Sequence, residues 1–505
     1  MKLSLLLSVL TLSHQVVGYK ILVISPTPSR SHATLARGIV TPLLEAGHQV
    51  TWGVPFMDQK PHPNLRLIDL SATLNHVPKM DMTQIRNDHG IVKEFATNIS
   101  RTTALNKDIR DTLVNDNYDA VVTEWFFSDT DAGFAAVQQV PWIMLSGMIM
   151  HPHVEGLVDE VRSISTVPMV FHDFTVPMSF YERVVNTFTF IMMRIGAILD
   201  ESTNAARYES YFSPLAAARG VPLPPYSEAI YNISVVLVQS HPSIAPALSL
   251  PPNVVDIGGY HIDKPQPLPQ DIQYILDSSP QGVVYFSMGS VIKGYRLPLG
   301  LRKDLIAMFG ELPYTVLWKF EEELQGLPKN VVVRKWWPQA GVLAHPNVKL
   351  FITHGGLLSS LEAVQFGVPL LAVPVFGDQP SNAARASRAG YARCVPYGDH
   401  IGPVLKEELN EMLNNDSYYK QAKYLSSLFN NRPVPPRKLI THYIELAIQS
   451  KGAYHLRSKT HLYPWYQRWF LDQLAVIIIL LSIPYLAVKR LCRKPNKPVK
   501  KTKKN

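Results

Sequence analysis

Short apolar runs that alternate with helical stretches are the feature that most restricts the fold of this 505-residue chain. A first group of runs comprises Tyr19 to Ser25, His48 to Pro55, Asn64 to Leu70, Asp119 to Trp125 and Trp142 to Ser146. A second group comprises Val283 to Ser287, Thr315 to Phe320, Val331 to Arg334, Leu350 to Thr353 and Pro369 to Pro374. Strands that alternate with helices form parallel sheets with helices on both faces. The pattern therefore predicts an α/β fold with two Rossmann-like sheets.

A proline-bearing stretch between the two groups, Ile262 to Gln270, is typical of a linker between domains. We therefore expect an N-terminal domain over residues 19–262 and a C-terminal domain over residues 263–445, facing each other across a cleft. Residues 446–470 are expected to form a helical segment that leads to a membrane. Because no fingerprint of spaced glycines follows the first strand, the sequence argues against a nicotinamide or flavin enzyme.

Both ends of the chain indicate a membrane. Residues 1–18 contain a single lysine and a leucine-rich run, as a cleaved secretory signal does. Residues 471–488 contain one charged side chain, Asp472, and are long enough to cross a bilayer as a helix. The tail, residues 489–505, carries nine cations and no acid, and such a tail stays on the cytoplasmic side. Since the ending KTKKN resembles a dilysine retrieval signal, we expect a single-pass protein of the endoplasmic reticulum membrane with a lumenal body.

The charge balance argues against binding of nucleic acid. The chain has 49 basic and 40 acidic side chains, and removal of the nine cations of the tail leaves 40 against 40. A neutral body without a recognition motif gives no basic surface for a phosphate backbone. The two cysteines, Cys394 and Cys492, lie on opposite sides of the expected membrane segment, so no disulfide is expected. Sequons for N-glycosylation, at Asn98, Asn232 and Asn415, all lie on the expected lumenal side.

A strand, a glycine turn and a helix in succession predict a site for an anion. The apolar run Leu350 to Thr353 is followed by His354, Gly355 and Gly356, and a helical pattern begins near Leu358. Two glycines allow the backbone to approach a ligand, and the start of a helix offers free N–H groups to a phosphate. The imidazole of His354 adds a donor. A turn of this kind by itself is more often structural.

Polar and aromatic residues nearby extend the predicted site from a phosphate to a nucleotide and a sugar. The strand from Pro369 to Val375 ends in a turn that carries Asp378 and Gln379, a carboxylate and an amide suited to sugar hydroxyls. Upstream, the sequence KWWPQ offers a flat indole at Trp336 and an amide at Gln339, which suit a base. Either tryptophan of this sequence can instead belong to a core.

Taken together, these residues resemble a family signature. The pattern runs through WxPQ, His345 and Pro346, FITHGG, Glu362, Gly367, Pro369 and GDQ. It resembles the C-terminal signature of the UDP-glycosyltransferases, the family that includes the UDP-glucuronosyltransferases, and is strongest from about Val283 to Asn382. The resemblance implies two Rossmann-like domains of the GT-B type, a UDP-sugar as donor substrate, and no further cofactor.

The resemblance also implies a role for each residue of the donor site. Trp336 would stack on uracil, Gln339 would contact the base or ribose, and Glu362 would bind the ribose hydroxyls. The diphosphate would lie against His354, Gly355 and Gly356, the sugar against Asp378 and Gln379, and Ser290 is also expected to contact the donor. One departure is visible: where vertebrate members usually have Thr-Asn-Gly, this chain has Leu357, Leu358 and Ser359, as arthropod members do. Ser359 or Ser360 is expected to replace the missing phosphate contact.

The N-terminal half supplies the expected base. His32 follows the first strand, at the place where the family has a histidine that takes the proton from the acceptor hydroxyl. A lone histidine at the start of a helix is otherwise more often a cap or a surface residue. In the family, an aspartate at the end of a later strand supports this histidine; here Glu124 takes its place, and Asp129 is the alternative.

Asp129 and Asp131 also form a DxD motif, which in glycosyltransferases of another fold binds manganese and the diphosphate. The glycine turn, the helix start and His354 already provide for the phosphate charge, so we expect no metal. Metal binding at the DxD motif is the alternative.

A methionine-rich segment from Trp142 to Leu199 predicts a lipophilic acceptor, with core packing as the alternative role. Part of this segment, Phe188 to Leu199, can also lie against the membrane. The expected function is inverting transfer of a hexose from a UDP-sugar, with UDP-glucose favoured over UDP-glucuronate, to a hydroxyl of a small lipophilic molecule. A catalytically weak lumenal binding protein for lipophilic ligands is the alternative from another class, and a homo-oligomer is compatible with either.

Overall fold

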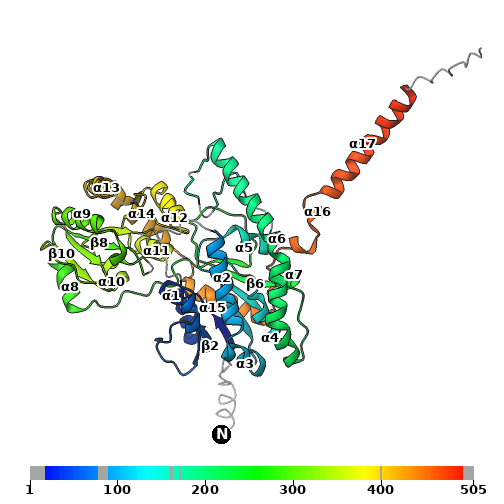
Figure 1. Cartoon of the computed structure of the whole chain (residues 1–505), viewed down its shortest axis with the longest axis horizontal. Helices are drawn as coiled ribbons and strands as arrows, with labels where there is room; N and C mark the ends of the chain where they lie inside the picture. Colours follow the sequence, from blue (N-terminus) through cyan, green and yellow to red (C-terminus); the bar gives the residue numbers. More distant parts are fainter. Residues whose placement is uncertain are drawn as a thin grey trace, which may run out of the picture. The chain divides into compact units, whose positions relative to one another are not determined.

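The computed structural model describes residues 18–77, 89–159, 163–169, 172–174, 176–290, 292–398 and 401–492. Nearly all of the expected signal segment and most of the basic tail lie outside these residues. The chain forms two compact units, Met1–Arg457 and Ser458–Asn505. Both sheets lie in the first unit (Figure 1).

The first sheet has seven parallel strands in the order β3-β2-β1-β4-β5-β6-β7. They are β1 (Lys20–Ile24), β2 (Gln49–Val54), β3 (Leu65–Asp69), β4 (Ala120–Trp125), β5 (Trp142–Ser146), β6 (Ile233–Val238) and β7 (Val254–Asp256). All five runs predicted for this sheet are strands. The prediction missed β6, which is buried along its whole length, and the short edge strand β7.

The second sheet has six parallel strands in the order β10-β9-β8-β11-β12-β13. They are β8 (Val283–Ser287), β9 (Thr315–Lys319), β10 (Val331–Arg334), β11 (Val348–Thr353), β12 (Leu370–Ala372) and β13 (Ala392–Cys394). The five predicted runs are again strands, and the edge strand β13 was missed. The expected α/β fold with two parallel sheets is confirmed.

Because the strands carry apolar side chains on both faces, each sheet packs against helices on both sides. One face of the first sheet packs against α1 (Arg30–Glu45) and α15 (Pro436–Gln449). The other face packs against α3 (Lys107–Asn115), α4 (Ala132–Gln138), α5 (Pro152–Val158), α6 (Phe180–Arg219) and α7 (Tyr226–Ala229). In the second sheet, α8 (Gln270–Asp277), α10 (Gln339–Ala344), α11 (Leu357–Phe366) and α14 (Asp416–Asn430) cover one face. Helices α9 (Leu299–Gly310) and α13 (Gly402–Asn414) cover the other.

Helix α15 returns the chain to the first sheet after the second sheet is complete. Its residues Ile440 and Ile444 are fully buried in the core that the first sheet shares with α1. Arg437 donates from Nε to the carbonyl oxygen of Tyr260 at 2.9 Å. The range expected for the second domain, residues 263–445, therefore includes a segment that packs with the first sheet.

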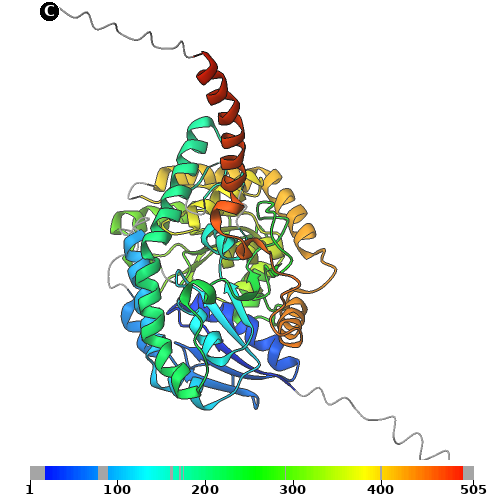
Figure 2. The ribbon, with the colours of Figure 1, turned by 90° about the vertical axis from the view of Figure 1, so that its right-hand side faces the viewer.

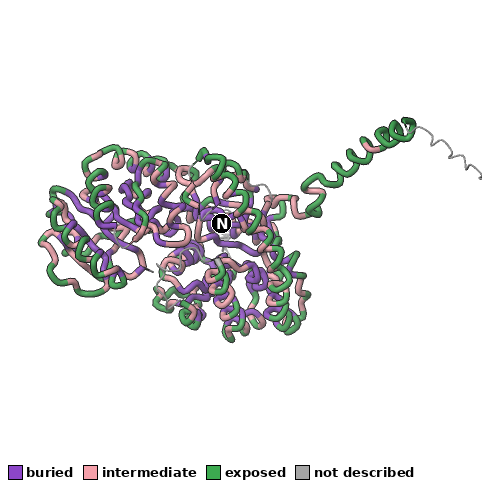
Figure 3. Tube along the Cα trace, turned by 45° about the horizontal axis from the view of Figure 1, so that its top comes forward, coloured by how far each residue is buried: buried purple, intermediate pink, exposed green. Residues whose placement is uncertain are grey.

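Two further helices bear on function. Helix α6 is 40 residues long, begins with a capping box between Ser179 and Glu182, and ends at Gly220 in a left-handed conformation; Figure 2 shows it as one unbroken helix. In the second unit, α16 (Trp465–Arg468) precedes α17 (Leu471–Cys492), which covers the expected span 471–488. Over the described residues, α17 is the one helix long and apolar enough to cross a membrane, and Figure 3 shows it exposed along its length.

The remaining elements are α2 (His89–Ala104), α12 (Gln379–Arg388) and the short 3-10 turns Ser71–His76, Gly294–Arg296 and Thr460–Leu462.

Candidate functional site

A histidine and a glutamate meet at the carboxyl ends of two neighbouring strands. His32 lies in the first turn of α1, which follows β1, and Glu124 is a buried residue of β4, the strand beside β1. Nδ1 of His32 donates to Oε1 of Glu124. A carboxylate at Nδ1 fixes the neutral imidazole with its proton on that nitrogen, so Nε2 is free to accept one.

The environment of His32 raises its pKa. Burial opposes the protonated imidazole, but the charge and hydrogen bond of Glu124 outweigh it, and Asp378 adds to the effect. Glu124 has its other oxygen, Oε2, buried without a hydrogen bond in the described chain, so its charge is directed largely at the histidine. The imidazole is 24% exposed, which leaves it accessible to a substrate.

Asp129, the alternative partner for His32, is used elsewhere. Its carboxylate accepts from Trp125 Nε1 at 2.9 Å and from His153 Nε2 at 2.6 Å. The paired His153 lowers the pKa of Asp129 against the opposing effect of burial. Of the two carboxylates considered from the sequence, Glu124 is the one that reaches His32, because its longer side chain extends from the strand itself.

Asp131, the second aspartate of the DxD motif, is also engaged within the protein. Asp131 accepts from the Ser100 hydroxyl at 2.6 Å, and burial, with the neighbouring Asp129, raises the pKa of Asp131 to about 7. Among the described residues, no three His, Cys, Asp or Glu side chains gather as metal ligands. The two aspartates instead serve different internal contacts.

The two neighbouring tryptophans have opposite environments. Trp337 is buried and donates from Nε1 to the carbonyl oxygen of Trp318 at 3.2 Å, so it belongs to the core. Trp336 is 66% exposed. An exposed indole that follows the carboxyl end of β10 offers a flat surface for a base.

Gln339 and Glu362 form a polar cluster beside Trp336. Gln339 donates from Nε2 to Ser359 Oγ at 3.0 Å and to Glu362 Oε2 at 2.5 Å, and it accepts from the Tyr285 hydroxyl at 3.2 Å. Burial raises the pKa of Glu362 to about 7, although the Gln339 amide opposes this shift. These groups from α10 and α11 can receive the hydroxyls of a ribose.

The turn between β11 and α11 is built around His354. Gly355 has a φ of +77°, which a side chain would disfavour, and Gly356 caps the helix, which begins at Leu357. A Cβ on Gly356 would lie 2.4 Å from Nε2 of His354, and one on Gly289 would lie 2.6 Å from its Cε1. Two glycines thus allow the imidazole to fit between the ends of β8 and β11.

His354 is held neutral beside a cation. Burial, together with the nearby Lys319, lowers the pKa of His354 to about 4. Lys319 ends β9, is largely buried, and pairs with Glu321 at 2.6 Å. Lys319 was not predicted from the sequence, although a lysine at the carboxyl end of a buried strand could have indicated a charged group at the site.

The serines near this turn differ in their availability. The Ser360 hydroxyl donates to the carbonyl oxygen of Gly356 at 3.0 Å and so is used within its own helix, whereas Ser359 accepts from Gln339. Ser290 directly follows Gly289 and is half-buried. Ser359 and Ser290 therefore remain as side chains for the donor.

Asp378 and Gln379 stand at the start of α12. Asp378 accepts from Asn382 Nδ2 at 2.7 Å, and burial raises its pKa. The side-chain oxygen of Gln379 accepts from the backbone N–H groups of Val375 and Phe376, at 2.9 and 3.1 Å. Gln379 therefore also shapes the turn that presents Asp378.

About two turns further along α12, Arg385 is a half-buried cation that sequence reasoning did not place. It donates to Ser381 Oγ at 2.5 Å and to Asn382 Oδ1. Burial lowers its pKa to about 10, and the charge of Asp378 opposes that shift. No carboxylate is hydrogen-bonded to this guanidinium in the described chain.

The charges of the two halves of the site act on each other. Asp378, from the second sheet, raises the pKa of His32, from the first, and His32 in turn stabilises the charged form of Asp378. A pocket of about 240 Å³ opens between Ile149 and Met150 beyond β5, the loop Pro242 to Leu250 beyond β6, and Arg385 of α12. Its walls are mostly apolar.

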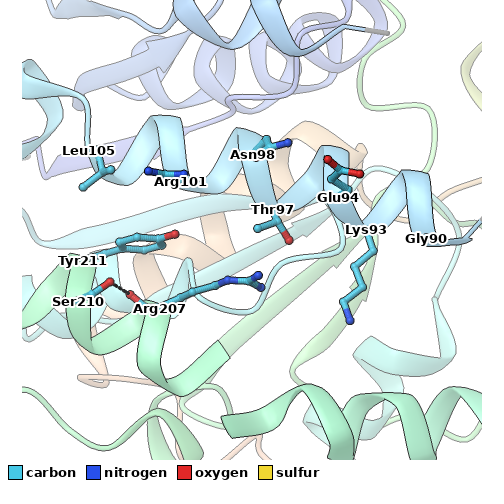
Figure 4. A pocket seen from close by; sticks show the side chains of 10 residues that line it. All are labelled: Gly90, Lys93, Glu94, Thr97, Asn98, Arg101, Leu105, Arg207, Ser210 and Tyr211. Carbon is cyan, nitrogen blue, oxygen red and sulfur yellow. Dashed lines mark hydrogen bonds between the residues drawn. The ribbon is translucent and has the colours of Figure 1, made fainter. Parts of the chain in front are cut away.

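A larger hollow, of about 680 Å³, lies between α2 and α6. Figure 4 shows Lys93 of α2 and Arg207 of α6 pointing into it. None of the residues predicted for the donor or the base lines this hollow, although it includes the sequon residue Asn98.

Two parallel sheets, each packed between helices, define the class of the protein: it has the GT-B fold of glycosyltransferases. The glycosyltransferase of kitacinnamycin matches with a TM-score of 0.56 and 18% identity, over 84% of this chain and 99% of that one. A UDP-glucosyltransferase from Polygonum tinctorium, titled as capable of glucosylating indoxyl, matches with a TM-score of 0.56 and 15% identity, over 85% and 98%.

The sequence identifies the family within this class. Residues 64–505 match the family model described as "UDP-glucoronosyl and UDP-glucosyl transferase", and the chain belongs to this UDP-glycosyltransferase family. UDP-glucosyltransferase 2 of Dactylopius coccus is 30% identical over 490 residues, 94% of this chain and 93% of that protein. UDP-glucuronosyltransferase 2B15 of Rattus norvegicus is 29% identical over 425 residues, 81% and 77%. The resemblance predicted from the motifs is confirmed, and the chain is a glycosyltransferase.

Proposed function

We propose that the enzyme transfers glucose from UDP-glucose to a hydroxyl of a small lipophilic acceptor, with inversion of the anomeric centre. The observation that carries this proposal is the pair of His32 and Glu124, whose imidazole also experiences the charge of Asp378 from the second half. A base of one sheet and a sugar-binding carboxylate of the other are the arrangement that such a transfer needs.

In the proposed reaction, Nε2 of His32 takes the proton of the acceptor hydroxyl. The acceptor oxygen forms a bond to the anomeric carbon as the bond from that carbon to the diphosphate oxygen breaks, and UDP leaves with the electron pair. Glu124 stabilises the imidazolium that results. Because the acceptor attacks opposite the departing UDP, an α-linked donor gives a β-glycoside.

The donor is proposed to lie along the second sheet. Trp336 stacks on uracil, Gln339 and Glu362 receive the ribose, and the diphosphate lies over Gly355, Gly356 and the first turn of α11. Lys319 and the helix start offset the charge that develops on UDP as it leaves. Asp378 and Gln379 face the sugar.

The acceptor is proposed to enter the pocket of about 240 Å³ near Met150 and α12. Its apolar walls suit a lipophilic molecule, and the methionine adapts to ligands of different shape.

UDP-glucuronate is the second candidate donor, and Arg385 is the observation that favours it. The guanidinium is half-buried about two helical turns from Asp378, and its bonds go to Ser381 and Asn382 rather than to a carboxylate. A sugar carboxylate would pair with such a cation. Glucose remains the first choice because Asp378, at the start of the same helix, is itself anionic when ionised.

We also propose the location: α17 anchors the enzyme in the endoplasmic reticulum membrane, with the catalytic unit in the lumen. The basic residues that follow α17 and the ending KTKKN support this orientation.

Replacement of the base tests the mechanism. His32→Ala should lower the rate of UDP release with an accepted phenol by about 10²- to 10⁴-fold, the usual contribution of a general base. Binding of UDP, measured by calorimetry, should be unchanged because His32 lies on the other sheet. A variant that retains the wild-type rate would refute the assignment. Parallel assays with UDP-glucose and UDP-glucuronate decide between the two donors.

A further inference from the structure

The N-terminal half of α6 exposes a band of large apolar side chains. We define this band as the α6 stripe: Phe180, Tyr181, Val184, Phe188, Ile191, Met192, Ile195, Ile198 and Leu199. Each of these residues is at least 43% exposed, and Phe180 and Leu199 reach 75% and 73%. On the surface of a soluble protein, exposed apolar residues are usually isolated, whereas a contiguous band indicates a surface that binds another molecule or a membrane.

The stripe occupies one side of the helix. With 3.6 residues per turn, its nine members fall within an arc of about 120° of the helix circumference. No polar residue between positions 180 and 199 falls within the same arc. The exposed polar residues of this half, Arg183 and Thr187, lie outside it. A helix with a wide apolar face of this kind is suited to lie in the plane of a lipid surface.

The stripe stops where the helix becomes polar. Beyond Leu199, the exposed positions of α6 include Glu201, Ser202, Thr203 and Glu209. The body of the unit buries one face of the second half, at Tyr208, Tyr211 and Phe212, whereas the outward face of that half is polar and the exposed band of the first half is apolar. This change within one helix separates a lipid-facing part from a water-facing part.

The second unit carries residues typical of a membrane boundary. Exposed aromatic residues directly precede α17, namely Tyr463, Trp465, Tyr466, Trp469 and Phe470. Trp and Tyr gather at the boundary between lipid and water. The chain between Arg457, the last residue of the first unit, and Tyr463 spans about 20 Å at full extension. So short a connection keeps the first unit next to the bilayer that α17 crosses.

A second copy of the chain fits the stripe less well. Helices that pair through an apolar seam carry charged residues on both sides of it, which select the partner. Here the positions at the margins of the stripe include Phe180, Met192 and Leu199, so the stripe is wide and its margins are apolar. Within positions 180–199, the exposed charged residue is Arg183, a cation, which suits anionic headgroups.

We propose that the α6 stripe inserts into the surface of the bilayer in which α17 is anchored, as a second membrane contact of the catalytic unit. This inference rests on the proposed anchoring by α17. The contact would hold the first sheet and its pocket against the lipid, where lipophilic acceptors are concentrated.

Site-specific fluorescence in vesicles tests the contact. The full chain, with Cys394→Ser and Cys492→Ser to remove its two exposed thiols, receives one cysteine labelled with an environment-sensitive dye. Phe188→Cys reports on the stripe, Ile478→Cys on α17, and Tyr274→Cys on an exposed apolar position of α8. The vesicles contain phosphatidylcholine and a minority of phosphatidylserine, with or without a spin label on the acyl chains.

The label at position 188 should shift to shorter wavelength and lose most of its emission to spin-labelled lipid, as the label at position 478 does. The label at position 274 should keep its emission. A blue-shifted label at 188 that the lipid does not quench would mean that protein, such as a second copy, covers the stripe, and would overturn the proposal. A label at 188 that behaves like the one at 274 would also overturn it. If the label at 478 is not quenched, the anchor proposal itself is wrong.

A matched pair of variants separates the stripe from general effects of added charge. Ile191→Glu with Ile195→Glu places two carboxylates in the stripe, and Tyr424→Glu with Leu428→Glu places them at the same spacing on exposed positions of α14. Only the first pair should abolish quenching at position 188. Equal quenching with both pairs would contradict insertion of the stripe, provided that circular dichroism shows both variants folded.

Discussion

The site depends on how single side chains balance burial against charge. His32 is protonated more readily than an ordinary histidine, because Glu124 and Asp378 outweigh its burial, whereas His354 is held neutral by burial and by Lys319. The two histidines are therefore prepared for different tasks. In the proposed reaction, His32 gains a proton, and His354 offers a neutral donor to the diphosphate.

Removal of the carboxylate at Glu124 should move the pH profile to lower pH. In Glu124→Gln, burial still lowers the pKa of His32, whereas the charge of Glu124 no longer raises it. The histidine therefore stays neutral at lower pH. The acid limb of kcat/KM should shift downward, and the plateau should fall by about 10²- to 10⁴-fold because the imidazolium loses its partner. Asp129→Asn is the matched control and should leave the position of the limb unchanged, since Asp129 pairs with His153. An upward shift in Glu124→Gln would contradict this account.

Glu362 should make the affinity for UDP depend on pH near neutrality. Its pKa is raised to about 7, so the carboxyl is largely neutral at pH 6 and ionised at pH 8. An ionised carboxylate accepts ribose hydroxyls more strongly, and the affinity for UDP should rise by about fivefold over this range. Calorimetry with Glu362→Gln measures the part that comes from UDP itself. Identical pH dependence in the variant and the wild type would rule out the role of Glu362.

At the scale of elements, the turn from β11 into α11 is the part on which donor binding most depends. The glycines of this turn make space for an imidazole between the ends of two strands. The start of α11 then faces the same space with its free N–H groups. Substitutions here act through shape rather than through loss of a charged group.

Gly356→Ala should weaken UDP binding by displacing His354. The new methyl group would lie 2.4 Å from Nε2 of the imidazole, too close for either to stay in place. Loss of one hydrogen bond to a charged phosphate corresponds to a decrease in affinity of about tenfold to a hundredfold. Gly300→Ala in α9, where a Cβ meets no atom within 4 Å, is the matched control and should bind UDP normally. Normal UDP binding by Gly356→Ala would show that His354 does not contact the diphosphate.

The elements also show how far sequence patterns reach. Ten apolar runs predicted ten strands, because burial on both faces leaves a continuous apolar run in a parallel strand. The edge strands β7 and β13 have three residues each and carry too little signal, while the signal of β6 was present in its apolar run. In the site, the motifs predicted candidate donor residues, but Lys319 and Arg385 acquire their surroundings only from tertiary packing. The choice between Glu124 and Asp129 likewise depended on which side chain turns toward His32.

At the scale of the whole molecule, the proposed topology predicts which parts a protease can reach. In sealed microsomes, trypsin should remove an epitope placed after Asn505 and leave the catalytic unit intact, because only the basic tail would face the cytoplasm. Addition of detergent should expose the rest of the chain. Digestion of the body in sealed microsomes, judged with an antibody to the first unit, would reverse the proposed orientation.

Helix α15 determines where the enzyme can be shortened. A soluble version without α17 that ended at residue 445 would lose Ala447 and Ala453 from the core beneath the first sheet, and one that ended at residue 430 would lose the entire α15, although both would retain the whole second sheet. The damage would then fall on the half that carries His32, far away in sequence from the cut. A secreted form should therefore keep the chain through Arg457. Its guanidinium donates to Oδ1 of Asn232 at 2.6 Å and holds the end of the catalytic unit in place.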